Sequence, residues 1–139
     1  MVDCRVVVEL EHKNAKMPQK AHITDACYDL YACEDLSVYP GESKIADLGF
    51  RLQLSEGWEA QIRGRSGLAK RGFMVHFGTI DHLYRKNVGV LVYNISQSVW
   101  SITSGDRIAQ LYIGRVWNSE LIAGAVQETE RGGFGSTGF

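Results

Sequence analysis

The chain has 139 residues, of which 45% are hydrophobic and 22% are charged. This length and composition are ordinary for one globular domain that buries a core of its own. The formal net charge is -1, which excludes a general attraction to nucleic acid or to an anionic membrane, so we expect neither as a partner. Anions must therefore be bound by a local arrangement of residues.

The three cysteines, Cys4, Cys27 and Cys33, lie in the first third of the chain and form no Cys-x-x-Cys pair. An odd number without metal-ligand spacing argues against a disulfide framework or a structural zinc site, and it suits a reducing compartment. There is no apolar run of membrane length and no charged-then-apolar leader. We therefore expect a cytoplasmic, or at least intracellular, protein.

Apolar and polar residues alternate with a period of two along most of the chain, which predicts strands. The expected strands are RVVVEL (5–10), FRLQL (50–54), WEAQIR (58–63), VGVLVYN (88–94) and RIAQLYIGRVW (107–117). Turn signals separate them, among them YPGE, LSEG and TSGD. Only SGLAKRG (66–72) predicts a short helix, with Ser66 as a candidate N-cap and Gly72 as its stop.

Many short strands with turns between them predict an all-β sandwich or barrel of jelly-roll type. No repeat or linker divides the chain, but from about Glu128 it becomes polar and rich in glycine. We expect a single domain in which residues 1–127 form a β body and residues 128–139 form a flexible C-terminal arm.

The first segment with chemical potential is DACYDLYA (25–32). Asp29 alternates with Tyr28 and Leu30, so its side chain should lie on the strand face opposite these neighbours. Two interpretations stay open, a solvated strand aspartate or a carboxylate that faces a metal-bound water in a cleft.

The second segment is RGRSGLA (63–69), at an expected strand-to-helix transition. Backbone N–H groups between Gly64 and Gly67, together with the guanidinium of Arg65, make a nest that suits phosphate oxygens. The alternative is an ordinary capped turn with a surface arginine.

The third segment is HFGTIDHLYRKNVGV (76–90), which predicts a strand, a turn and a second strand paired as a hairpin. Free backbone groups of a hairpin can recognise a flat base by imitating a pairing edge. We expect Asp81 to be buried between Ile80 and the turn, with Tyr84 close by. Asp81 is either a general base that orients a water or a turn aspartate that bonds its own backbone.

The fourth segment is SGDRIAQLYI (104–113), in which Gly105 and Asp106 predict a hairpin turn held by Asp106 and Arg107. Gln110 is polar among apolar neighbours, so it either pairs internally or contacts a ligand. The fifth is the tail RGGFGSTGF (131–139), whose glycines, hydroxyls and single aromatic suit a segment that closes over phosphate and a base. The alternative is a frayed terminus.

These five segments occur in the order of the five motifs of the trimeric dUTPases, which the chain resembles from about Lys20 to Phe139. The resemblance implies a distorted β jelly roll that forms a homotrimer, exchanges its C-terminal arms and builds three active sites between subunits. It also implies hydrolysis of dUTP to dUMP and pyrophosphate, with Mg²⁺ held mainly by the triphosphate. Such an enzyme keeps uracil out of DNA and supplies dUMP for dTMP synthesis.

The resemblance also implies roles for individual residues. Asp81 would orient and activate the water that attacks the α-phosphorus, and Asp29 would support the network of metal and water. Phosphates would be cradled by Arg65, Ser66 and Gly67 with help from Gln110. Uracil would be read, without room for a 5-methyl group, by the backbone of Gly78 to Gly89, including Thr79 and Ile80, while Tyr84 would pack on the deoxyribose. From another subunit, Phe134 would stack on uracil, and Arg131, Gly135, Ser136 and Thr137 would meet the outer phosphates.

The chain departs from the family pattern at Cys27, Phe77 and Lys86, and it lacks the acidic residue that the family usually has near His82 or Leu83. Phe77 should matter most, because we expect its bulk to lie beside the base pocket and to reshape it. Two rival functions share the resemblance, a dCTP deaminase of related fold and a non-catalytic relative that binds nucleotide and signals through partner proteins. Tyr84 and the tail favour the dUTPase over the deaminase, and the non-catalytic relative stays open.

Overall fold

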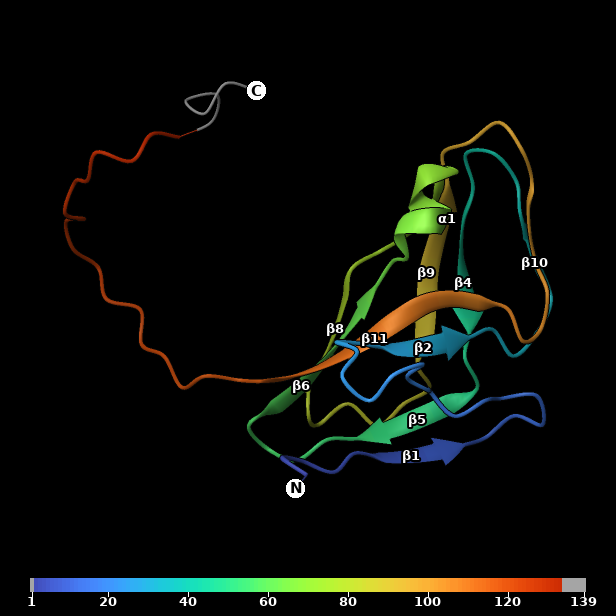
Figure 1. Ribbon diagram of the computed structural model, residues 1–139, viewed down its shortest axis with the longest axis horizontal. Coiled ribbons are helices and arrows are strands. Elements are labelled where there is room, and N and C mark those ends of the chain that lie inside the picture. Colours follow the sequence, from blue (N-terminus) through green and yellow to red (C-terminus); the bar gives the residue numbers. More distant parts are fainter. Residues whose placement is uncertain (1, 134–139) are drawn as a thin grey trace.

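The computed structural model describes residues 2–133 (Figure 1). The predicted roles of Phe134, Gly135, Ser136 and Thr137 lie outside these residues and stay predictions. Within the described range the elements are β1 (Val7–Leu10), β2 (Tyr28–Tyr31), β3 (Leu36–Val38), β4 (Ser43–Asp47), β5 (Phe50–Gln53), β6 (Trp58–Arg63), α1 (Ser66–Lys70), β7 (Phe73–Val75), β8 (Gly78–Ile80), β9 (Gly89–Asn94), β10 (Trp100–Ile102) and β11 (Arg107–Arg115).

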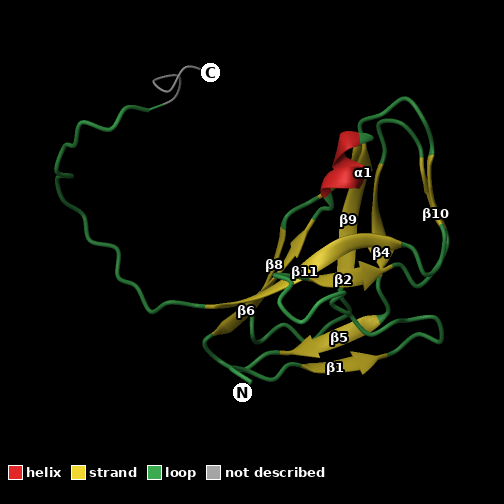
Figure 2. Ribbon diagram, viewed as in Figure 1, coloured by secondary structure: helices red, strands yellow, loops and turns green. Residues whose placement is uncertain are grey.

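The strands form small antiparallel sheets that wrap around one core (Figure 2). One sheet has the order β2-β11-β6-β8, a second has the order β4-β9-β7, and two further pairs are β1-β5 and β10-β3. No helix in residues 2–133 is long and apolar enough to cross a membrane. The layout confirms the predicted all-β class.

The period-two alternation places one face of each sheet in the core. In the four-stranded sheet, Leu30, Ile62 and Leu111 are buried, while Phe50 and Val92 are buried from β5 and β9. Burying side chains of this size removes on the order of 2 kcal/mol of unfavourable hydration for each, so the alternation selects the register in which they face inward. The opposite face of the four-stranded sheet is left for polar residues.

Helix α1 lies between β6 and β7 and is shorter than the segment predicted. Arg65, not Ser66, occupies the N-cap position and makes no side-chain cap, so the predicted N-cap is wrong. Gly72 does end the helix, with a φ of 85° that favours glycine. A Cβ at this position would also meet the Ser96 Cβ at 2.9 Å.

The chain leaves the body where β11 ends. The Val116 N–H donates to the Gly57 carbonyl at 2.8 Å, and residues 117–133 then run away from the body as an exposed segment without strands, orange to red in Figure 1. We call residues 117–133 the arm. Regular structure thus ends well before residue 128, where the change in composition placed the boundary.

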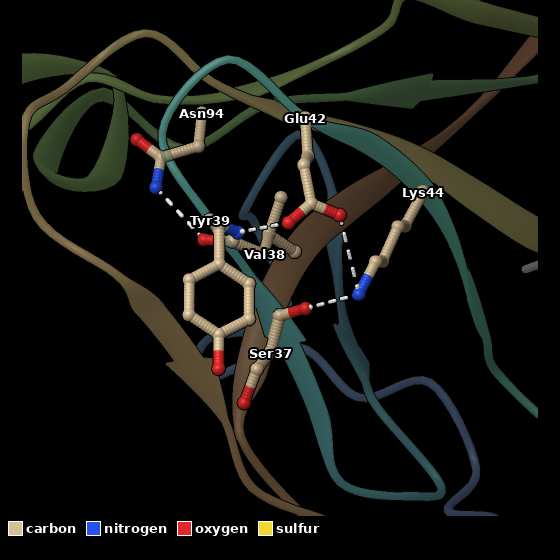
Figure 3. A network of polar contacts seen from close by, with 6 residues as sticks. All are labelled: Ser37, Val38, Tyr39, Glu42, Lys44 and Asn94. Atoms are coloured by element: carbon tan, nitrogen blue, oxygen red, sulfur yellow. Dashed lines mark hydrogen bonds and ion pairs between the residues drawn. The ribbon is translucent and has the colours of Figure 1, made fainter.

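Asn94 has a buried amide that joins parts of the body distant in the sequence, and Figure 3 shows its contact with Val38 at the end of β3. Its Nδ2 donates to the Val38 carbonyl at 2.9 Å and to the Ser98 carbonyl at 2.6 Å. Its Oδ1 accepts from the backbone N–H and the hydroxyl of Ser96. The side chain therefore closes the loop after β9 and fastens it to the end of β3. Lys44 adds an outer brace between Glu42 and the Ser37 carbonyl.

We expect Asn94→Ala to lower the free energy of unfolding by about 3 kcal/mol, because two carbonyls lose their donor and a buried void forms. Denaturant unfolding followed by fluorescence measures this change. Ser37→Ala is the matched control, because only the backbone carbonyl of Ser37 takes part. A loss below about 1 kcal/mol for Asn94→Ala would contradict the role assigned to the amide.

Candidate functional site

A row of polar side chains crosses the four-stranded sheet. Gln110 of β11 lies directly opposite Asp29 of β2 on one side and Arg63 of β6 on the other. Directly opposed residues of antiparallel strands place their side chains on the same face, so these three share the face away from the core. Asp29 thus lies opposite the face of buried Leu30, as the alternation predicted.

A β-bulge adds Arg107 to the same face. The register of β11 against β2 shifts between Arg107 and Ala109, and both Ile108 and Ala109 are buried. Arg107 and Gln110 are three residues apart, so in a regular strand they would face opposite ways. The bulge brings both outward, and an Arg107 Nη1 lies 3.4 Å from the Asp29 Oδ2.

Hydrogen bonds fasten the turn after β6 to this row. The Gln110 Nε2 donates to the Gly64 carbonyl at 2.9 Å, and the Arg65 Nη1 donates to the Arg107 carbonyl at 3.2 Å. Of the two interpretations of Gln110, internal pairing is the one present in this structure. Its partner is the turn that carries the phosphate-cradle residues.

The turn presents donors outward. Ser66 and Gly67 are exposed, and Arg65 is half-buried beside them. A Cβ added at Gly67 would meet nothing within 4 Å, so a large anion could approach this backbone closely. The second and fourth segments therefore meet beside Asp29, where guanidinium and hydroxyl donors suit phosphate oxygens.

A second hollow lies at the β8 edge of the sheet. This pocket of about 250 Å³ is lined by Ile62, Gly78, Thr79, Ile80, Tyr84, Asn87, Val88 and Gly89. The Tyr84 hydroxyl donates to the Asn87 carbonyl at 2.8 Å, which fixes the ring at the mouth of the pocket. The predicted base-reading residues Gly78, Thr79, Ile80, Tyr84 and Gly89 are thus brought together.

The predicted hairpin over residues 76–90 is wrong, although both of its strands exist. β8 pairs with β6, whereas β9 pairs with β4 and β7. The outer edge of β8 therefore carries no paired strand within the described residues. The Leu91 carbonyl accepts from the His76 N–H at 2.8 Å, so the backbone groups of Leu91 point to the edge of β9 that pairs with β7. Gly89 lies two residues earlier on β9, so its backbone groups point to the same edge, at a place beyond the end of β7.

Two further expectations about this region are wrong. Asp81 is exposed instead of buried, because the chain turns outward after buried Ile80, and the Asp81 carbonyl accepts from the Tyr84 N–H at 3.0 Å. Phe77 does not line the pocket. Its ring lies against Arg63, on the face that carries Gln110, because Phe77 is one residue out of phase with Gly78.

Arg131 lies in the arm, where its backbone N–H donates to the Thr129 hydroxyl at 3.3 Å.

The sequence analysis assigned Arg107 only to the turn before β11. Its pairing with Asp29 was missed because strand register and the bulge depend on residues far apart in the sequence. Asp106 does hold the turn, since its Oδ2 accepts the Thr103 N–H at 2.9 Å.

The carboxylates can be tested as metal ligands. In residues 2–133 no three acidic, histidine or cysteine side chains gather into a metal-binding group. Asp29, with a side chain 24% exposed, can accept hydrogen bonds from water around a cation. This donor set fits a Mg²⁺ that arrives with a triphosphate.

Comparison of the sequence with known proteins finds relatives along nearly the whole chain. A sequence model of the dUTPase family matches residues 13–138. Deoxyuridine 5′-triphosphate nucleotidohydrolase of Gloeothece citriformis is 40% identical over 138 residues, which cover 95% of this chain and 94% of that protein.

Solved structures agree in fold. The dUTPase of Staphylococcus bacteriophage 80alpha, in a point mutant bound to dUpNHpp, has a TM-score of 0.84 at 26% identity, covering 96% of this chain and 99% of that one. A dUTPase from phage phi11 of S. aureus, described as coordinating a structural Mg(II) ion, has a TM-score of 0.79 at 25% identity over 94% and 99%. These matches confirm the predicted jelly-roll-like fold.

We expect Gln110→Ala to weaken binding of inorganic tripolyphosphate about two- to tenfold, because the Gly64 carbonyl loses its donor and the turn carrying Arg65 loosens. Isothermal titration calorimetry measures the affinity. Gln61→Ala on the same face is the matched control and should bind as the unmodified protein does. Equal affinity in all three proteins would show that the turn does not depend on Gln110.

Proposed function

The chain belongs to the dUTPase family, and we propose that it hydrolyses dUTP to dUMP and pyrophosphate. The observation that carries the proposal is the gathering of Asp29, Arg107 and Gln110 with the turn of Arg65 on one face of the sheet. Beside this gathering, the pocket at β8 offers backbone groups and a fixed tyrosine. Such an enzyme would keep uracil out of DNA and supply dUMP for dTMP synthesis.

The chemistry asks for position and charge more than for a covalent partner. The oxygen of a water forms a bond to the α-phosphorus, and the bond from that phosphorus to the oxygen bridging the β-phosphate breaks. The carboxylate of Asp81 takes the proton of the water, and pyrophosphate leaves. The exposed position of Asp81 on the turn after β8 suits a base that meets a substrate arriving from outside.

The cradle residues hold the charged end of the substrate. The guanidinium of Arg65, the hydroxyl of Ser66 and the backbone of Gly67 bind phosphate oxygens, and Gln110 keeps their turn in place. Asp29 orients water around the cation. Mg²⁺, when bound with the triphosphate, neutralises phosphate charge and favours attack.

The base pocket selects uracil and deoxyribose. Backbone donors and acceptors at β8 and Gly89 match a pyrimidine edge, and a base that lacks the matching groups would leave buried polar groups unpaired. The Tyr84 ring is 41% exposed and is held by Asn87, so it can pack on the sugar and exclude a 2′-hydroxyl.

The site is shared between copies in this proposal. The base pocket lies at the β8 edge of the sheet, while Asp29 lies on β2 at the opposite edge. We infer a homotrimer in which one copy supplies the base pocket with Asp81 and a second supplies the phosphate cradle. A third copy brings Arg131 of its arm, and Phe134, Gly135, Ser136 and Thr137 of the tail that follows the arm, over the substrate.

We expect Mg²⁺-dependent release of pyrophosphate from dUTP, with rates from dCTP, dTTP and UTP at least about 100-fold lower, because the pocket would leave unmatched groups or clash with the extra substituents. A phosphate-coupled assay with all four nucleotides measures this. Release of ammonia from dCTP would instead support the deaminase. Binding of dUTP without any product would support the non-catalytic relative.

We expect Asp81→Asn to lower kcat for dUTP at least about 100-fold while binding of the nucleotide stays within about threefold, because the amide cannot accept the proton.

The same variant tests whether each site is shared between copies. Co-refolding it with Arg65→Ala should restore about a quarter of the unmodified activity, because random mixing pairs an intact Asp81 with an intact Arg65 in that share of sites. Two inactive variants that stay inactive when mixed would argue that each site lies within one copy.

A further inference from the structure

A cleft of about 420 Å³ lies between α1 and the turn that precedes β11. Three guanidinium groups line it, those of Arg65, Arg71 and Arg107, together with the apolar side chains of Phe73 and Trp100. Arg71 has no part in the proposed reaction. The cleft is therefore a positively charged extension of the phosphate cradle, with apolar groups beside its charges.

The charges of the cleft are unequally satisfied. Arg65 donates to the Arg107 carbonyl, and Arg107 is paired with Asp29. The one lining carboxylate, Asp106, accepts the Thr103 N–H. Arg71, by contrast, forms no side-chain hydrogen bond or ion pair with any residue of the described range 2–133.

Stacked rings hold Arg71 in place. Its guanidinium carbon lies 4.8 Å from the centroid of the Phe73 ring, and Phe73 is stacked on Trp100 with 4.9 Å between centroids. A guanidinium on an aromatic face keeps its N–H groups directed outward and loses little side-chain entropy when a carboxylate binds. The cleft thus presents an oriented donor without an acceptor.

The arm carries a segment with matching chemistry. In VQETE (126–130), Val126, Glu128 and Glu130 are two residues apart, so they lie on one side of an extended chain. Val126 is 88% exposed, and both glutamates are exposed without an ion pair in the described part of the chain. This side of the arm combines two negative charges with one apolar side chain.

We propose that residues 126–130 from the arm of another copy dock in the cleft, with Glu128 and Glu130 on Arg71 and with Val126 on the neighbouring apolar groups. The proposal rests on the proposed function, in which the arm crosses to another copy. Figure 1 supports an occupant from outside, because the arm leaves its own body at β11 and extends away from it. A hydrated inorganic anion would leave the apolar groups uncovered, whereas a peptide covers both.

Docking at the cleft gives the tail a short tether. Arg131 follows Glu130 directly, so an anchored arm holds Arg131 next to the cradle before the substrate binds. The residues that close the site are then present at a high effective concentration, and the loss of chain entropy on closure is smaller. Arg71 is thus a positioning residue that acts through the arm and does not touch the nucleotide.

The test is a charge reversal with a matched rescue. Arg71→Glu should weaken binding of a non-hydrolysable dUTP analogue about three- to tenfold, measured by isothermal titration calorimetry, because attraction becomes repulsion. Adding Glu128→Lys and Glu130→Lys to the same chain should return the affinity to within about twofold of the unmodified protein. Arg5→Glu makes the same change of charge at another exposed position and should have no effect.

A chain that ends at Gln127 separates the two proposals. In this shortened chain Arg71→Glu should cause no further loss, because its partners are gone. An equal loss of affinity from Arg71→Glu in both chain lengths would mean that Arg71 contacts the nucleotide directly, which overturns the docking proposal. The proposal also fails if Arg71→Glu causes no loss of affinity in the full chain, or if the two lysines do not restore it. If the shortened chain without Arg71→Glu binds the dUTP analogue and turns over dUTP as the full chain does, the closing role of the arm in the proposed function is wrong.

Discussion

The placement of β11 between β2 and β6 is the constraint on which the candidate site depends. Its register sets Gln110 opposite Asp29 and Arg63, and its bulge turns Arg107 to the same face. The bulge exists because Ile108 and Ala109 are both buried, so the apolar core determines which polar side chains meet. Once Gln110 and Arg107 face outward, they hold the turn after β6, so strand pairing also places the groups that we propose to bind phosphate.

The divergence of β8 and β9 leaves free the backbone groups that we propose to read the base. A paired hairpin would satisfy the backbone groups between the two strands. Because β8 joins the four-stranded sheet and β9 joins the three-stranded sheet, those backbone groups stay available at the pocket lined by Gly78 and Gly89. An edge strand of this kind would invite aggregation, but β8 has only three residues and ends at an exposed turn. Its short length makes the edge usable for one flat ligand.

The sequence predicted what is local and missed what depends on distant partners. Alternation identified β6 and β11 and the outward face of Asp29, because one buried face imposes a period of two. The hairpin over residues 76–90 was wrong because alternation does not say which strand pairs with which. Asp81 was placed inside because Ile80 is apolar, although the turn that follows leads away from the core. The side to which Phe77 points depends on the pairing of β8 with β6, which the pattern does not contain.

The clustering of arginines around one cleft explains how a chain with a net charge of -1 can still offer a positive site to the polyanion of the proposed reaction. Arg65, Arg71 and Arg107 concentrate positive charge in one cleft, and the acidic groups of the arm lie far along the chain from it. Arg71 and Arg107 are exposed and Arg65 is half-buried, so solvent screens part of their mutual repulsion, but three like charges around one cleft still favour a negative partner. A negative partner relieves this repulsion, whether a triphosphate at the cradle or carboxylates at Arg71. In the two proposals the triphosphate uses Arg65 and the acidic arm uses Arg71, so the arm can dock beside the substrate without taking the charge that the substrate needs.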